Sequence, residues 1–136
     1  EDKYSEDAAI IFLRVGRDCG SRNHNRPILY TGFLTHGFGG GKKEGSKIQR
    51  LSDMADIVDC DFYIGGHTHM PAALKLDFIR TSPANGSFSY APHLFVNAAS
   101  KLRYSGYPVR GGFKPANLDT PRIIFGGTRK SMEAVI

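Results

Sequence analysis

The chain contains no tryptophan and only two cysteines, Cys19 and Cys60, which form no Cys-x-x-Cys pair. Their spacing leaves a disulfide open without favouring one, and Cys60, next to an apolar strand, is interpreted as a buried thiol. No apolar run approaches the roughly 20 residues that a membrane-spanning helix needs. The first ten residues, EDKYSEDAAI, lack the pattern of a signal peptide. We therefore expect a cytoplasmic protein with no membrane segment.

The composition is that of one soluble domain, which we assign to residues 1–136. The chain is 40% hydrophobic and 23% charged, values that suit a globular protein with one hydrophobic core. Sixteen glycines and seven prolines indicate that loops and turns take up much of its length. The formal net charge of +5 suits a phosphorylated or polyanionic partner, although solubility alone would also account for it.

Three apolar segments predict strands of an α/β fold. The run AAIIFLRVG (8–16) predicts a buried strand, and PILYTGFLTHG (27–37) predicts a second strand that ends at His36. The short segment FYIG (62–65) predicts a third strand, which leads into His67. A helix is predicted between the second and third strands, so these strands are expected to be parallel neighbours. Ligands gather at the carboxyl ends of such strands, where both histidines fall.

The helix is predicted from Ser46 to about Asp59. Ser46 and Gln49, three residues apart, match the capping-box pattern for a helix start. One buried face is predicted by the apolar side chains that recur at helical spacing, which are Ile48, Leu51, Met54 or Ala55, and Val58. The preceding segment FGGGKKEG (38–45) is too rich in glycine to predict regular structure.

The pattern changes after Pro71. The segments ALKLDFIRT (73–81) and SYAPHLFVNAAS (89–100) flank a turn and predict an antiparallel hairpin. Residues 101–121 are irregular, basic and aromatic. The last segments, RIIFGG and MEAVI, predict two short strands joined at residues 128–131.

The segment FYIGGHTHMP (62–71) carries the most specific chemical motif. His67 and His69 are two residues apart, a spacing that places both side chains on one face of an extended segment but not of a helix. Imidazole is a good ligand for zinc, manganese or iron. The plain alternative is a pair of surface histidines on a turn. Metal ligation is favoured by the two glycines, by the short strand and by His36 at the end of the preceding strand.

The segments THGFGGG (35–41) and IGGHTHMP (64–71) resemble the last two signature blocks of the calcineurin-like metallophosphoesterases. The longer pattern NRPILYTGFLTHGFGGGKKEG…ADIVDCDFYIGGHTHMP is most similar in style to phage and prophage members of that family. The similarity extends over about residues 12–71 and thins over residues 90–136.

This resemblance implies a two-sheet αββα sandwich and a hydrolase that cleaves a phosphomonoester or a phosphodiester. It also implies two divalent ions as cofactors, with manganese, iron and zinc as the candidates. In that family two metals about 3.5–4 Å apart share a hydroxide that attacks phosphorus in line. By motif, His36 and His67 would ligate one ion and His69 would ligate the other.

The other signature blocks of the family are missing from the sequence. They are Asp-x-His, Gly-Asp-x-x-Asp and Gly-Asn-His, which supply the bridging aspartate, an asparagine ligand and a histidine that assists the leaving group. The resemblance therefore implies that this chain is the C-terminal half of a metallophosphoesterase and is inactive alone. Its expected assembly is self-association or pairing with an N-terminal half. The alternative is a non-catalytic scaffold or binding fragment of the same fold.

Three further residues are candidates for substrate binding. Lys42 and Lys43 follow the glycine run and would meet a substrate phosphate, although a flexible loop with solvated lysines is the plainer interpretation. The run fails the P-loop pattern, because His36 stands at the first glycine position and Lys43 stands where Ser or Thr is needed. Asn97 ends a predicted strand and would line the site.

The remaining histidines, His24 and His93, are expected to be structural or solvated. One segment interleaves basic and aromatic residues, namely Arg103, Tyr104, Tyr107, Arg110, Phe113 and Lys114. Such a segment suits a nucleic-acid strand through phosphate contacts and base stacking, which makes nucleic acid a further candidate partner. An ordered loop that packs its aromatic rings inward is the interpretation that we favour.

Overall fold

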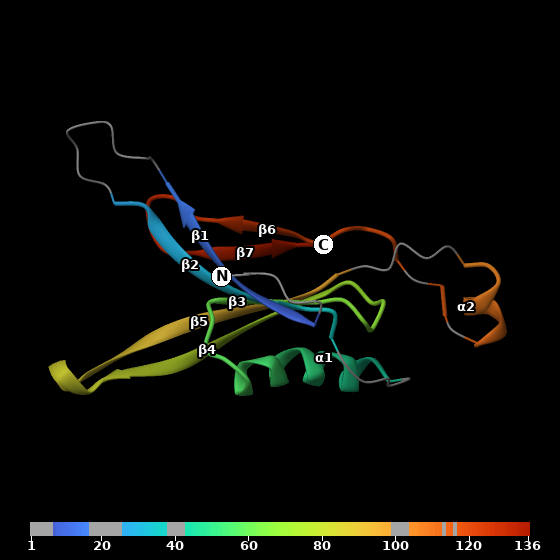
Figure 1. Ribbon diagram of the computed structural model, residues 1–136, viewed down its shortest axis with the longest axis horizontal. Helices are drawn as coiled ribbons and strands as arrows, with labels where there is room; N and C mark the ends of the chain where they lie inside the picture. The colour runs from blue at the N-terminus through green and yellow to red at the C-terminus, as the bar shows by residue number, and fades with distance from the viewer. Residues whose placement is uncertain (1–6, 17–25, 38–42, 99–103, 113, 116) are drawn as a thin grey trace.

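The computed structural model describes residues 7–16, 26–37, 43–98, 104–112, 114–115 and 117–136. These residues form a mixed α/β fold with a five-stranded sheet, a two-stranded sheet and few helices (Figure 1). The larger sheet has the order β1-β2-β3-β5-β4, from β1 (Ala8–Val15), β2 (Ile28–Thr35), β3 (Phe62–Gly65), β5 (Ser87–Asn97) and β4 (Ala72–Ser82). The smaller sheet pairs β6 (Arg122–Phe125) with β7 (Met132–Val135).

The larger sheet buries side chains on both faces. The cluster on the face that α1 (Glu44–Ser52) covers consists of Phe33, Leu51, Met54, Cys60, Tyr63 and Phe95. The cluster on the opposite face, against the smaller sheet, consists of Tyr30, Phe62, Leu94, Val96 and Met132. Successive residues of a strand point to opposite faces, which is why Phe62 and Tyr63 belong to different clusters. The result is three layers, with the helix, the larger sheet and the smaller sheet stacked in that order (Figure 1).

Hydrogen bonds of the Tyr30 hydroxyl hold the smaller sheet against the larger one. Its side chain is completely buried, and its hydroxyl lies 2.7 Å from the carbonyl oxygen of Gly126 and 3.0 Å from the amide nitrogen of Ser131. The hydroxyl donates to Gly126 and accepts from Ser131, so a buried polar group is satisfied in both of its roles. The turn between β6 and β7 is thereby held on the face of β2.

Strands β2, β3 and β5 run parallel at the centre of the larger sheet. Phe33 lies beside Tyr63 in the β2–β3 pair, and Tyr63 lies beside Phe95 in the β3–β5 pair. The predicted parallel pairing of the second and third strands is therefore confirmed. Because the three strands share one direction, the residues that follow Thr35, Gly65 and Asn97 emerge at the same edge of the sheet.

The predicted helix is present, but its start and length were wrong. It begins at Glu44 with Lys43 as the N-cap residue, ends at Ser52, and is followed by a turn of 3-10 helix at Asp53–Asp56. Ser46 does not cap it. Its hydroxyl instead donates to the carbonyl oxygen of Lys43 at 2.8 Å, because it already lies within the first turn. The predicted apolar face is largely confirmed, with Leu51 and Met54 buried and Ile48 38% exposed.

The first strand is also not buried as predicted, because it lies at the edge of the larger sheet. β1 pairs antiparallel with β2, and one of its faces packs on the cluster between the sheets through Ile11, Leu13 and Val15. On the other face, Phe12 is 67% exposed. A continuous apolar run indicates burial on both faces, yet among the described residues nothing covers the second face at Phe12.

The remaining strands agree with those predicted from the sequence. β4 and β5 form an antiparallel hairpin, and β6 and β7 form the short closing pair. The stretch predicted to be irregular contains one short helix, α2 (Tyr107–Arg110), which lies away from the sheets (Figure 1). The predicted buried thiol of Cys60 is confirmed, with 2% of the residue exposed. Within the described ranges, no helix is both long enough and apolar enough to cross a membrane.

Candidate functional site

The loops that follow β2 and β3 are joined by backbone hydrogen bonds. The amide groups of Gly66 and His67 both donate to the carbonyl oxygen of His36, at 3.1 and 2.7 Å. Gly37, with a φ of +90°, adopts a conformation that residues with a Cβ rarely take. A Cβ added at Gly37 would lie 3.2 Å from the Cβ of His67, which is a tight contact. The glycine thus allows the two histidine loops to approach closely.

The two imidazoles that this junction positions lie edge to face. The Nε2 atom of His36 is 3.2 Å from the Nδ1 atom of His67, and the ring planes make an angle of 79°. One ring must donate its N–H to the other for these atoms to form a hydrogen bond. Two nitrogens bound to one tetrahedral ion at about 2.0–2.1 Å lie about 3.3 Å apart. The nitrogen–nitrogen separation is therefore close to that of two ligands on one ion, and ligation would require both ring lone pairs to turn from each other toward that ion.

His69 does not join this pair. Its side chain is exposed, and its backbone has a φ of 55°, in the left-handed region that few residues other than glycine adopt. Its amide donates to the carbonyl oxygen of Gly66 at 3.2 Å, which closes a tight turn. Within the described residues no three His, Cys, Asp or Glu side chains are grouped so that they could hold a metal ion. Two of the three predicted ligands, His36 and His67, therefore lie together.

Asn97 holds the histidine loop in place. It is 5% exposed, and its side-chain NH₂ group donates to the hydroxyl of Thr68 at 2.8 Å and to the carbonyl oxygen of Met70. The amide of Ala98 donates to the carbonyl oxygen of Gly65 at 2.7 Å, which continues the β3–β5 pairing into the loops. Asn97 ends its strand and lines the site, as the sequence predicts, and its visible contacts position the loop.

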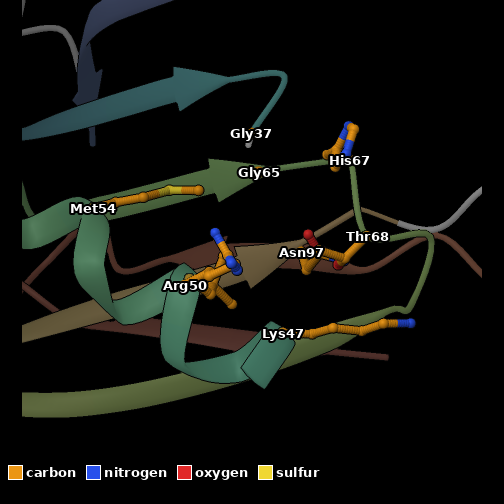
Figure 2. Close-up of a pocket in the computed structure, with 10 residues that line it drawn as sticks. Gly37, Lys47, Arg50, Met54, Gly65, His67, Thr68 and Asn97 are labelled. Carbon is orange, nitrogen blue, oxygen red and sulfur yellow. The ribbon is translucent and has the colours of Figure 1, made fainter. Parts of the chain in front are cut away.

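A small, shallow pocket that opens to solvent lies between α1 and the histidine loop. Figure 2 shows Lys47, Arg50 and Met54 on its helical side, and His67, Thr68 and Asn97 on its sheet side. Gly37, Gly65 and Gly66 also line it. A Cβ at Gly65 would meet the terminal methyl of Met54 at 2.6 Å, so glycine is what lets the helical segment lie this close to β3.

Sequence reasoning missed Lys47 and Arg50. Both lie in the row that runs through Leu51 and Met54 at spacings of three and four residues, so the helical periodicity that predicted the buried face contained the signal. Lys43 is exposed at the start of α1 and does not line the pocket. Lys42 and His24 lie outside the described residues.

His93 belongs to the core, in agreement with a structural role. It is 4% exposed and stacks on Phe78, with 4.4 Å between ring centroids. Burial lowers the pKa of His93, because the charged form loses hydration, and this effect outweighs the neighbouring carboxylate of Asp59. Burial likewise raises the pKa of Tyr63, whose hydroxyl lies 3.4 Å from the His93 ring, to about 12.

The basic and aromatic segment is only partly described. Tyr104 is 50% exposed, so the expectation of inward packing is wrong for that ring. Lys114 forms an ion pair with Glu44 at 3.0 Å, which links the segment to the start of α1. Arg103 and Phe113 lie outside the described residues.

In comparisons with known proteins, no family model, curated protein or solved structure matches the chain.

Proposed function

We propose that this chain carries part of the metal site of a calcineurin-like metallophosphoesterase. The observation that supports the proposal best is the 3.2 Å separation of the His36 and His67 ring nitrogens at the ends of neighbouring parallel strands. Two sheets packed face to face, with α1 on the outer face of the larger one, are compatible with the C-terminal part of a two-sheet αββα sandwich.

In this proposal His36 and His67 would hold one divalent ion, with manganese, iron and zinc as candidates, and His69 would turn toward a second. The remaining ligands would come from a part of a longer protein that contains the missing signature blocks. Bound ions would supply an activated water and neutralise the oxygens of a phosphomonoester or phosphodiester. The Gly37 and Asn97 contacts would hold the two histidine loops in position for these ions.

The first test is metal binding by the isolated chain. Because only two histidines converge, we expect weak binding of zinc or manganese, with fewer than two ions per chain. In titration calorimetry, His36→Ala or His67→Ala should each lower the affinity by at least tenfold, since each removes one of two ligands. His69→Ala is the matched control and should change it by less than threefold. Two tight sites, or affinity that survives the loss of His67, would contradict the ligand assignment.

The second test is activity in a parent chain that carries the missing blocks. That protein should hydrolyse bis-p-nitrophenyl phosphate with added manganese, and His67→Ala should lower its turnover by orders of magnitude because a direct ligand is lost. Residues 1–136 alone should be nearly inert. Strong activity of the isolated chain that EDTA abolishes would show that the ligand set is complete without another segment.

A non-catalytic scaffold is the second candidate function. The observation that favours it is that His36 and His67 can satisfy each other through a hydrogen bond. In that case the chain should bind neither zinc nor manganese at millimolar concentrations, which the calorimetric titration would show directly.

A further inference from the structure

The larger sheet ends on one side at β4, which has no strand beyond it among the described residues. β4 is 11 residues long, contains no proline, and pairs with β5 in an unbroken register from Ala72 to Ser82, so no bulge interrupts its free edge. β3 pairs only with the Leu94–Asn97 part of β5, and the rest of the hairpin extends past β3 as a two-stranded arm (Figure 1). A long, regular edge strand offers its free backbone N–H and C=O groups to another strand.

Apolar side chains of β4 are exposed beside this free edge. Leu76 is 36% exposed, Phe78 is 38% exposed and Ile79 is 63% exposed. Leu76 and Phe78 lie on the helix-covered side of the sheet, because they are two and four residues from Leu74, which packs against the cluster on that side. A strand added at this edge would therefore cover apolar surface as well as backbone groups.

Charged side chains often protect an edge strand from pairing, yet those of β4 suit one kind of partner. Arg80 is already paired with Asp59 at 2.7 Å. Lys75 donates to the carbonyl oxygen of Met132 at 3.0 Å, which holds its ammonium in place without neutralising the charge. Asp77, two residues away on the same face, has no ion-pair partner among the described residues. A partner strand with an acid opposite Lys75 and a base opposite Asp77 would match both charges.

A second copy of β4 has its charges in that arrangement. In an antiparallel pair related by a two-fold axis perpendicular to the sheet, side chains directly opposite each other point to the same face. With the axis at Leu76, Lys75 of each copy lies opposite Asp77 of the other copy. Moving the axis by one residue puts either Lys75 or Asp77 opposite itself, so like charges disfavour both neighbouring registers. The axis at Leu76 gives the one face-matched register that opposes unlike charges within β4.

We propose that the chain forms a two-fold symmetric dimer by antiparallel pairing of β4 with β4 of a second copy, centred on Leu76. Residues 72–80 of the two strands then lie opposite one another, with Phe78 opposite Leu74. The two five-stranded sheets become one continuous sheet. This dimer does not depend on the proposed function. It leaves Phe12, which is exposed at the opposite edge, available for association beyond the dimer.

The first test exchanges the charges in a Phe12→Ser background, which limits association at the opposite edge. In sedimentation velocity at low salt, Lys75→Asp and Asp77→Lys should each weaken the dimer at least tenfold, because two attractive pairs become two repulsive ones. An equimolar mixture of the two variants should form a heterodimer with an affinity within threefold of the parent dimer, since each strand carries the charges that the other lacks. Arg122→Asp makes the same charge change as Lys75→Asp at an exposed position of β6 and should change the affinity less than twofold.

The second test measures the register by disulfide cross-linking in a Cys19→Ser background, which leaves the buried Cys60 as the only native thiol. Opposite residues of an antiparallel pair have Cα atoms about 4.5–5.5 Å apart, which suits a disulfide, so Leu76→Cys should link to its own copy across the axis. The control is Ile79→Cys, because the two copies of residue 79 lie about 20 Å apart along the strands. Under one mild oxidant, Leu76→Cys should cross-link at least tenfold faster, although Ile79 is the more exposed position.

Three results would overturn the dimer. The first is a Phe12→Ser chain that stays monomeric at high concentration, which would leave this edge to a different chain. The second is the absence of a heterodimer in the mixture of Lys75→Asp and Asp77→Lys. The third is cross-linking of Ile79→Cys at a rate equal to that of Leu76→Cys, which would indicate random collision at an exposed strand.

Discussion

Asp61 is the charged residue most deeply placed in the described fold. It precedes β3, and its carboxylate accepts hydrogen bonds from the amide and hydroxyl of Thr31 in β2, at 2.8 and 3.2 Å. The ammonium of Lys130, from the turn between β6 and β7, lies 2.7 Å away, and the Asp61 side chain is 8% exposed. One carboxylate thus links two central strands and the second sheet.

These contacts contribute to the pH dependence of stability. Burial acts to raise the pKa of Asp61, but the bonds from Lys130 and Thr31 outweigh it, so the pKa lies below its ordinary value of 3.8. A lowered folded-state pKa stabilises the fold above the unfolded pKa, and this contribution is lost as the pH falls through the folded pKa.

We therefore expect the Asp61 contribution to the free energy of unfolding, measured by urea titration as the difference between the wild type and Asp61→Asn, to fall as the pH drops below about 4. Asp61→Asn should lower the free energy of unfolding at pH 7 by about 1–3 kcal/mol, because a buried charged acceptor is lost. It should also flatten the decline in acid. Asp119→Asn, at an exposed carboxylate, is the control. An equally steep decline in Asp61→Asn would show that other groups carry the acid sensitivity.

At the scale of the elements, glycines allow neighbouring strands, and the helical segment and β3, to approach one another closely. Gly32 of β2 lies against the ring of Phe62 in β3, and a Cβ there would come within 2.2 Å of a ring carbon. Phe62 is 1% exposed and held between the sheets, so its ring cannot move aside without disturbing the core. A Cβ added at Gly45, within α1, would meet no atom within 4 Å apart from its chain neighbours and the backbone of its own helix.

Two alanine substitutions should therefore have opposite effects in urea unfolding. Gly32→Ala should lower the free energy of unfolding by about 1–3 kcal/mol, as expected for overpacking of a filled core. Gly45→Ala should raise it by about 0.5–1 kcal/mol, because alanine loses less backbone entropy than glycine in a helix. A neutral Gly32→Ala would show that the β2–β3 contact is looser than described.

Local sequence patterns predicted which helices and strands form. They predicted less well where these elements begin and end, and which residues face them in the fold. The crossover order of strand, helix and strand was enough to place His36 beside His67, because parallel strands end at a common edge. The capping pattern at Ser46 failed because a serine inside the first turn bonds backward as readily as one at the cap. Lys47 and Arg50 were missed as pocket-lining residues because the pocket also depends on the loop after β3, which no local pattern in α1 contains.

At the scale of the whole molecule, the larger sheet has an uncovered apolar area. Phe12 of β1 is 67% exposed, with Ile10 at 46% and Leu29 of β2 at 47%. Ile10 lies opposite Phe33, and Leu29 follows the same alternation, so these side chains share the face that α1 covers farther along the sheet. β1 is also the edge strand, with one side unpaired among the described strands. Exposed apolar area on an edge strand favours association with another chain or segment.

We expect the isolated chain to self-associate as its concentration rises, in sedimentation velocity at physiological salt. Burying a phenylalanine contributes about 1.5–3 kcal/mol, so Phe12→Ser should weaken association at least tenfold. Val109→Ser is the control, since Val109 is 50% exposed on α2, away from the sheets. A chain that stays monomeric at high concentration would indicate that this face needs no partner. Equal effects of the two variants would place the association elsewhere. If a further segment of a longer protein occupies this face, adding it in trans should dissolve the self-associated species into a one-to-one complex.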